Sequence, residues 1–177
     1  MEQTGQNVSP MSNEGRNAYV IEHLEKTLIE LLKKKPLNDI SVSELCERAG
    51  VGRTSFYRNF ESREDIIKGY VNQLFGNLIR KNFVEPEPKL SESIHIIFSH
   101  FEEHREFYGL LNKRGLILLL KDVIIEIFGA KPEQSAVEAY TKAFAAYSLY
   151  GWIEVWFNRG MQESAEELSQ LFRAAGL

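Results

Sequence analysis

The sequence has little cysteine and little proline, and it has no long hydrophobic run. A single cysteine, Cys46, cannot form a disulfide within the chain, which favours a reducing compartment such as the cytoplasm. The longest apolar stretches, such as 116–120, fall far short of the ~20 residues that cross a bilayer. The first 14 residues lack a basic segment followed by an apolar one, so we expect no secretory signal. Prolines and glycines lie mostly between the periodic apolar segments, which favours helices. The single cysteine and the lack of a signal or membrane span favour a cytoplasmic protein.

The charge is unevenly distributed along the chain, whose formal net charge is −4. Residues 16–84 carry twelve lysines and arginines against nine acidic residues, whereas residues 85–177 carry nine against fourteen. A relatively basic first half followed by an acidic second half is consistent with a DNA-binding domain followed by a second domain with a solvent-exposed acidic surface.

Apolar residues recur at three- and four-residue spacings over most of the chain, which predicts an all-α fold. Residues 1–15 are polar and aperiodic, so we expect a disordered tail there. Pro86 and Pro88 block helix continuation and mark the expected boundary before a C-terminal domain. The expected domains are a tail at 1–15, a helix-turn-helix domain at 16–62, a connecting helix at 63–84 and a C-terminal domain at 85–177. The expected helices are 17–35, 42–49, 53–59, 63–83, 90–103, 105–113, 115–128, 133–158 and 164–174.

Two short helices with a glycine-containing turn stand near the N-terminus. Ser41 and Glu44 form a capping-box pattern, in which the serine bonds the Glu44 amide and the glutamate reaches back to the Ser41 amide. Gly50 suits the left-handed position that ends this helix, and Gly52 can cap the next one, at 53–59. This is the sequence outline of a helix-turn-helix.

The second of these helices carries side chains that suit DNA. Phe56 and Phe60 lie four residues apart and can anchor the helix on a core. Arginine pairs with both acceptors of a guanine edge, small hydroxyl residues allow close approach, and tyrosine commonly bonds phosphates. The residues expected to point outward are Arg53, Thr54, Ser55, Tyr57 and Arg58.

The segment 40–66 resembles the DNA-binding signature of the TetR (tetracycline-repressor-like) regulators. The resemblance is dense over 37–70, and its most specific part is Ala49-Gly-Val51 followed by Phe56-Tyr-x-x-Phe60. It implies an all-α subunit of about nine helices, with an N-terminal three-helix helix-turn-helix domain and a C-terminal ligand-binding and dimerisation domain. It further implies a homodimer, a palindromic operator on double-stranded DNA, an unknown small-molecule effector and, in most cases, repression.

The resemblance also adds DNA-contacting residues. It places Ser41 and Ser43 near phosphates, Tyr57 and Asn59 on the DNA backbone, and Lys68 as a further phosphate contact. The sequence departs from the family pattern at Gly52, where a hydroxyl residue is common, and at Asn59, where histidine is frequent.

The C-terminal half is rich in aromatic residues, which suggest a pocket and a subunit interface. Apolar side chains between 140 and 157 fall on more than one helical face, so one face can meet a partner. Together with the last helix, this stretch could form an intersubunit four-helix bundle, although an ordinary monomer core is the alternative. The expected interface residues are Leu149, Ile153, Trp156, Phe157, Leu168 and Phe172. The aromatic pocket candidates are Phe98, Phe101, Phe107, Tyr108, Phe144 and Tyr147.

Other functions have weaker support in the sequence. His100 and His104 stand four residues apart, a spacing that can bind a metal, but no cysteine accompanies them, so we expect neither a metal nor another cofactor. Cys46 occupies an apolar helix position typical of a packing residue. No catalytic set is recognisable, so we do not expect an enzyme. The alternative function is a helical protein-interaction adaptor without sequence-specific DNA binding.

Overall fold

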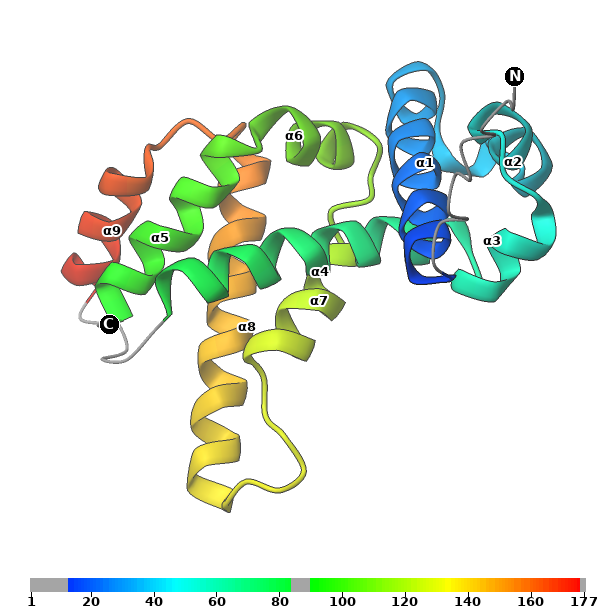
Figure 1. The fold of residues 1–177 in the computed structure, drawn as a ribbon. Helices are drawn as coiled ribbons and strands as arrows, with labels where there is room; N and C mark the ends of the chain where they lie inside the picture. The colour runs from blue at the N-terminus through cyan, green and yellow to red at the C-terminus, as the bar shows by residue number, and fades with distance from the viewer. Residues whose placement is uncertain (1–12, 84–89, 176–177) are drawn as a thin grey trace, which may run out of the picture. The chain divides into compact units, whose positions relative to one another are not determined.

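The structure is a computed structural model that describes residues 13–83 and 90–175, and in these ranges it contains nine α-helices and no strand (Figure 1). The prediction of an all-α fold is therefore confirmed. No helix in these ranges is long and apolar enough to cross a membrane. The helices are α1 (Asn13–Lys34), α2 (Val42–Ala49), α3 (Arg53–Asn59), α4 (Arg63–Asn82), α5 (Leu90–Glu103), α6 (Arg105–Lys113), α7 (Leu119–Phe128), α8 (Ala136–Asn158) and α9 (Ala165–Ala174), with a short 3-10 helix η1 (Leu37–Asp39).

The chain divides into two compact units between Ile66 and Ile67, near the start of α4. The N-terminal unit contains α1, η1, α2 and α3, and the C-terminal unit contains α5 to α9. Helix α4 is one continuous helix that begins in the first unit and continues through the second. The segment 85–88, where the prolines predict a domain boundary, lies outside the described residues.

Local capping explains where the helices of the C-terminal unit begin. Helix α7 begins at Leu119 and not at 115, because Gly115 has a φ of +69° and Leu116 N donates to Leu111 O (2.8 Å) in the turn that ends α6. Helix α8 begins at Ala136 because Ser135 and Glu138 form a complete capping box. These starts lie three to four residues after the predicted ones.

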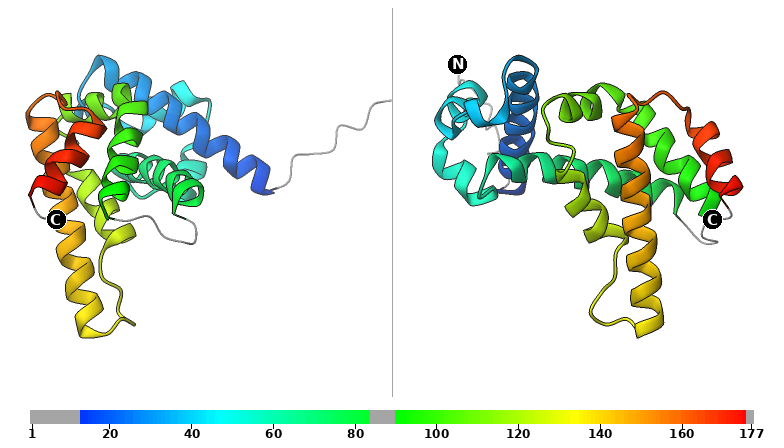
Figure 2. Two further views of the ribbon diagram at one scale, coloured as in Figure 1. Left: turned by 90° about the vertical axis from the view of Figure 1, so that its left-hand side faces the viewer. Right: turned by 180° about the vertical axis from the view of Figure 1, so that it is seen from behind.

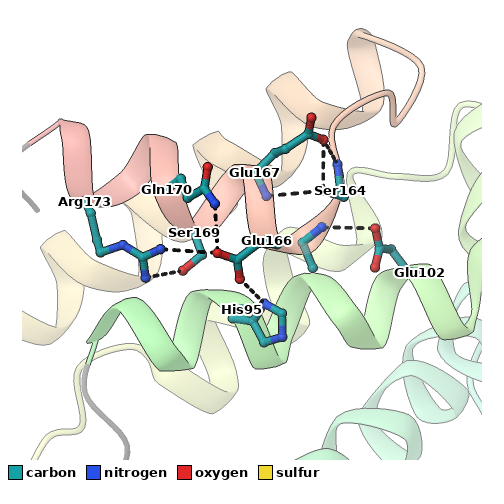
Figure 3. Close-up of polar contacts among 9 residues, drawn as sticks. His95, Glu102, Ser164, Glu166, Glu167, Ser169, Gln170 and Arg173 are labelled. Carbon is teal, nitrogen blue, oxygen red and sulfur yellow. Dashed lines mark hydrogen bonds and ion pairs between the residues drawn. The ribbon is translucent and has the colours of Figure 1, made fainter.

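Helix α9 packs along α5 through an ordered set of polar contacts (Figure 3). Ser164 and Glu167 form a full capping box at the start of α9. The Ala165 amide donates to Glu102 Oε1 of α5 at 3.0 Å. Glu166 Oε2 lies 3.6 Å from His95 Nδ1 of α5, so the first turn of α9 is tied to α5 at two points.

An interlocked aromatic cluster fills the interior of the C-terminal unit. Phe101 lies edge-on to Tyr108 with ring centroids 4.6 Å apart, and Phe98 lies edge-on to Trp156 at 5.4 Å. Phe75 of α4 joins the same cluster at 5.8 Å from Phe101. All five side chains are fully buried. Edge-to-face aromatic packing of this kind is favourable and makes these rings part of the core.

The structure does not bring the six aromatic pocket candidates together. Phe98, Phe101 and Tyr108 belong to the buried cluster, and Phe107 is half-buried against Tyr70. Phe144 and Tyr147 are exposed on α8. Some of these aromatic residues therefore belong to the core and others to the exposed face of α8, a difference that their helical spacing could not predict.

Helix α8 is apolar on two opposite faces. One face is buried in the C-terminal unit from Ala146 onward. In every view the first turns of α8 extend past α5 and α9, beside the connection from α7 (Figures 1 and 2). The opposite face is exposed along the whole helix and forms what we call the α8 stripe, composed of Val137, Tyr140, Phe144, Tyr147 and Val155.

The predicted interface residues lie on the buried faces of α8 and α9. Each is at most 7% exposed within a single subunit, so none is available to a partner, and the prediction of these particular residues needs correction. The physical reason is that α8 has two apolar faces, and its own subunit covers the face to which these side chains belong. The residues whose predicted interface role is withdrawn are Leu149, Ile153, Trp156, Phe157, Leu168 and Phe172.

A carboxylate is buried in the N-terminal unit. Glu25 of α1 is only 7% exposed, and burial raises its pKa to about 7, with a smaller contribution from the neighbouring Glu22. Because this folded-state pKa lies above the ordinary value, Glu25 contributes stability at low pH, and that contribution is lost as the pH rises through about 7.

We therefore expect Glu25→Gln to stabilise the protein at pH 8 by about 1–3 kcal/mol and to change its stability little at pH 5. Urea unfolding at both pH values measures the difference. Glu30→Gln is the control, because Glu30 is exposed on the same helix and paired with Lys33. Equal effects of both variants at pH 8 would contradict the assignment to Glu25.

Candidate DNA-binding surface

Helix α2 is positioned by its two ends. Ser41 caps it, since the Ser41 hydroxyl accepts from the Glu44 amide at 3.1 Å. Gly50 has a φ of +65°, the left-handed conformation that a glycine adopts without strain, and Val51 N then donates to Cys46 O at 2.9 Å. This sharp turn places α3 directly after α2, as the sequence predicts.

The second half of the predicted capping box at Ser41 does not form. Glu44 Oε2 instead lies 2.5 Å from Lys35 Nζ at the end of α1, and Glu44 Oε1 lies 3.3 Å from Arg48 Nε. The hydrogen bond from Lys35 is the main cause that lowers the Glu44 pKa. Glu44 therefore connects α2 to α1 and does not close its own helix end.

Helix α3 is held from behind by one aromatic residue. Phe56 is fully buried, and the half-buried Phe60 lies next to it with ring centroids 6.1 Å apart. Gly52 occupies the N-cap without a side-chain hydrogen bond. The predicted anchoring of α3 is thus found in the structure, with Phe56 carrying most of it.

The opposite face of α3 is exposed and carries two arginines, a threonine and a tyrosine. Arg53, Thr54, Tyr57 and Arg58 are all exposed, with Tyr57 at 55%. Within the described residues, the side chains of Arg53 and Arg58 make no hydrogen bond or ion pair. Both guanidinium groups therefore keep all their donors for an external acceptor.

The remaining predicted contacts differ in availability. Ser41 and Ser43 are exposed, and Ser55 is half-buried. Asn59 is half-buried, and its Nδ2 donates to Ser55 O at 2.8 Å, so its amide is partly used within α3. Lys68 Nζ lies 2.6 Å from Asp122 Oδ2 of α7, an ion pair that the spacing in sequence could not reveal.

Sequence reasoning missed the residue that fastens α4 to the N-terminal unit. Arg63 donates to Leu37 O at 2.9 Å and also to Ile40 O. Both acceptors belong to buried residues around η1. The only sequence signal was a positive charge in the first turn of a helix, where the helix dipole disfavours it.

Cys46 packs in the interior of the same unit. Its side chain is buried, and burial raises the pKa of its thiol, while the nearby Arg53 opposes this shift. The packing role expected from the sequence agrees with this environment, because a buried neutral thiol is a poor nucleophile.

Two family models match this chain. The model described as bacterial regulatory proteins of the tetR family covers residues 26–70, and one described as a transcriptional regulator C-terminal region covers 89–175. The chain belongs to the TetR family. The first match contains the whole α2–α3 surface, and the second covers the helices of the C-terminal unit from α5 onward.

Curated relatives of this TetR-family chain are themselves named as helix-turn-helix regulators. The chain is 24% identical over 162 residues to the uncharacterized regulator YxbF of Bacillus subtilis, covering 83% of this chain and 42% of that protein. It is 28% identical over 100 residues to the regulator EthR of Mycolicibacterium smegmatis, covering 52% of this chain and 44% of that protein. The chain thus spans less than half the length of these relatives.

Solved structures share the fold of this chain. Lin0861 from Listeria innocua matches with a TM-score of 0.70 and 14% identity over 94% of both chains. A TetR transcriptional regulator from Streptococcus agalactiae matches with a TM-score of 0.58 and 19% identity over 90% of this chain and 94% of its own. At such identities the likeness concerns the fold alone.

Arg63→Gln should lower the stability of the N-terminal unit by about 1–3 kcal/mol, because it removes a charged donor from two carbonyls of buried residues. Chemical denaturation measures the loss. Arg58→Gln is the matched control, since the Arg58 side chain makes no such contact within the described residues. A loss for Arg58→Gln as large as that for Arg63→Gln would show that the carbonyl contacts do not matter.

Proposed function

We propose that this protein is a DNA-binding transcriptional regulator that uses α3 as its recognition helix. The observation that carries the proposal is the division of α3 into a buried Phe56 and an exposed face with two arginines that have no partner within the described residues. Such a helix can enter a major groove without losing its anchor, and its guanidinium groups can pair with guanine edges. The family match and the names of the relatives support the same function.

We further propose that the regulator binds a palindromic operator as a homodimer and that it acts as a repressor. Two recognition helices then enter successive major grooves about 34–36 Å apart. A small-molecule effector bound in the C-terminal unit would change that separation and lower the DNA affinity without altering the contacting residues.

The α8 stripe supports the homodimer. Tyr140 and Phe144 are 80% and 67% exposed, and Tyr147 is 54% exposed. Since an aromatic side chain offers about 200 Å², these three expose roughly 400 Å², half of the ~800 Å² that each partner contributes to a standard interface. The stripe continues into an apolar groove of about 560 Å³ between α8 and α9. Along the groove, Ser148 and Gly151 add little side-chain bulk, so a second α8 can approach closely.

Selection of bound duplexes from a random library, at moderate salt and without added ligand, tests the DNA-binding proposal. We expect enrichment of a palindrome. Arg53→Ala should then weaken binding by about 1–3 kcal/mol and relax the preference at one base position in each half-site. Lys113→Ala on α6 is the control for loss of one charge. If no duplex is preferred over random competitor, the regulator proposal fails and the adaptor alternative gains.

Sedimentation tests the dimer. We expect a dimer at roughly micromolar concentration, and a monomer for Phe144→Asp, because a twofold interface buries the introduced charge twice. Lys142→Asp adds the same side chain on the other side of α8 and should stay dimeric. A wild-type monomer would refute the interface and the half-site spacing together.

A further inference from the structure

A polar groove lies between α4 and α5, within the C-terminal unit. It has a volume of about 370 Å³, inside the ~300–1,000 Å³ range of small-molecule sites. None of the six aromatic pocket candidates lines it, although its residue His100 also packs against Phe101 of the aromatic cluster. Its lining consists of Leu74, Asn77, Leu78, Lys81 and Asn82 of α4 and His95, Ile96, Ser99, His100, Glu103 and His104 of α5.

Most of the lining side chains can form hydrogen bonds, and several have capacity to spare. The side chains of Lys81, Ser99 and His104 make no hydrogen bond or ion pair within the described residues. Asn77 uses its Oδ1 to accept from Arg80 Nη2 at 2.6 Å, which leaves its amide group available as a donor and brings a second cation beside the groove. The leucines and Ile96 supply an apolar strip between these polar groups.

Donors outnumber carboxylates in this lining. Lys81 is a permanent cation, and His104 can donate hydrogen bonds to a ligand. His95 can donate through Nε2, because its Nδ1 faces Glu166 Oε2 of α9 at 3.6 Å. Glu103 is the only carboxylate of the lining, and its side chain is exposed. No three histidine, cysteine or acidic side chains in the described ranges are grouped to hold a metal ion. The groove therefore offers an anion several hydrogen-bond donors, and two carboxylates oppose it: Glu103 in the lining and Glu166 beside His95.

We propose that the α4/α5 groove binds a small anionic metabolite through Lys81, His95 and His104, and that it is the effector site of this regulator. The anionic group is a carboxylate or a phosphate, and the apolar part of the molecule lies on Leu74, Leu78 and Ile96. The effector assignment rests on the proposed DNA-binding function, whereas binding in the groove does not.

Helix α4 connects the groove to the helix-turn-helix. Its groove residues lie between Leu74 and Asn82, and its first residue, Arg63, holds the carbonyls of Leu37 and Ile40. A ligand that favours one position of α4 against α5 therefore acts on a helix that begins in the N-terminal unit. Coupling between the two sites requires only that the ligand bind one position more tightly than the other.

A buried pair forms one wall of the groove. His100 Nε2 lies 2.9 Å from the Tyr108 hydroxyl of α6. Burial is the main cause that lowers the pKa of His100 to about 4, and His104 adds to it, so His100 is neutral at pH 7. Changes at His100 on ligand binding would therefore report contact or movement and not protonation.

The histidines offer a direct test in the full chain without DNA. Three of the four histidines of this protein line the groove, and the fourth, His23, lies on α1 and serves as an internal control. Imidazole resonances are followed by NMR at pH 7.5 and constant ionic strength while inorganic phosphate, acetate or benzoate is added. We expect saturable shifts of His95 and His104 and no comparable shift of His23. Phosphate and carboxylate probes distinguish the two anion sources by their relative affinity.

Variants that remove one charge from the groove test whether the ligand is negatively charged. Lys81→Gln should weaken binding of the best probe about tenfold, and Glu103→Gln should strengthen it, because one removes an attraction and the other a repulsion. Lys113→Gln on α6 should leave it unchanged. The absence of saturable shifts, equal shifts of His23, or the reverse order of the two groove variants would overturn the proposed site.

The effector assignment has its own readout. At saturating probe, the affinity for a selected duplex should fall at least fivefold in the wild type and much less in Lys81→Gln. If the groove binds the probe and the DNA affinity is unchanged, the effector assignment is wrong although the regulator function stands. If no duplex is bound at all, the proposed function fails independently of the groove.

Discussion

The burial of Phe56 is the contact on which the proposed DNA-binding surface depends. Helix α3 has only seven residues, and a helix of two turns is unstable in water without tertiary packing. Phe56 supplies that packing and at the same time fixes which residues face outward. The left-handed Gly50 and the cap at Ser41 set the direction in which α3 leaves α2. Removing any of these would change the orientation of Arg53 and Tyr57 without touching them.

The N-terminal unit is stabilised by charged side chains that bond one another or backbone carbonyls, whereas the two arginines of α3 make no such contact within the described residues. Glu44 pairs with Lys35 and Arg48, and Arg63 bonds the carbonyls around η1. These contacts connect α1, α2 and the start of α4. The side chains of Arg53 and Arg58, in contrast, take part in no such contact within the described residues. The residues that stabilise the domain are therefore different from those that are proposed to contact DNA.

The helices and the helix-turn-helix could be predicted from the sequence because their signals are local. Caps such as Ser41 and Ser164, the glycine at position 50 and the apolar period each depend on residues only a few positions apart. Long-range pairs had no such signal. Lys68 is paired with Asp122, 54 positions away, and Arg63 reaches back more than 20 positions to η1. The two apolar faces of α8 could not be ranked either, because periodicity shows that a face is apolar but not what covers it.

The α8 stripe has a consequence for the newly made chain. In a single subunit Tyr140 and Phe144 are exposed to water, and only the proposed dimer would cover them. Contiguous exposed apolar surface of this kind promotes unspecific association. The isolated subunit should therefore be the aggregation-prone species. The yield of soluble protein then depends on whether the proposed dimerisation is faster than unspecific association.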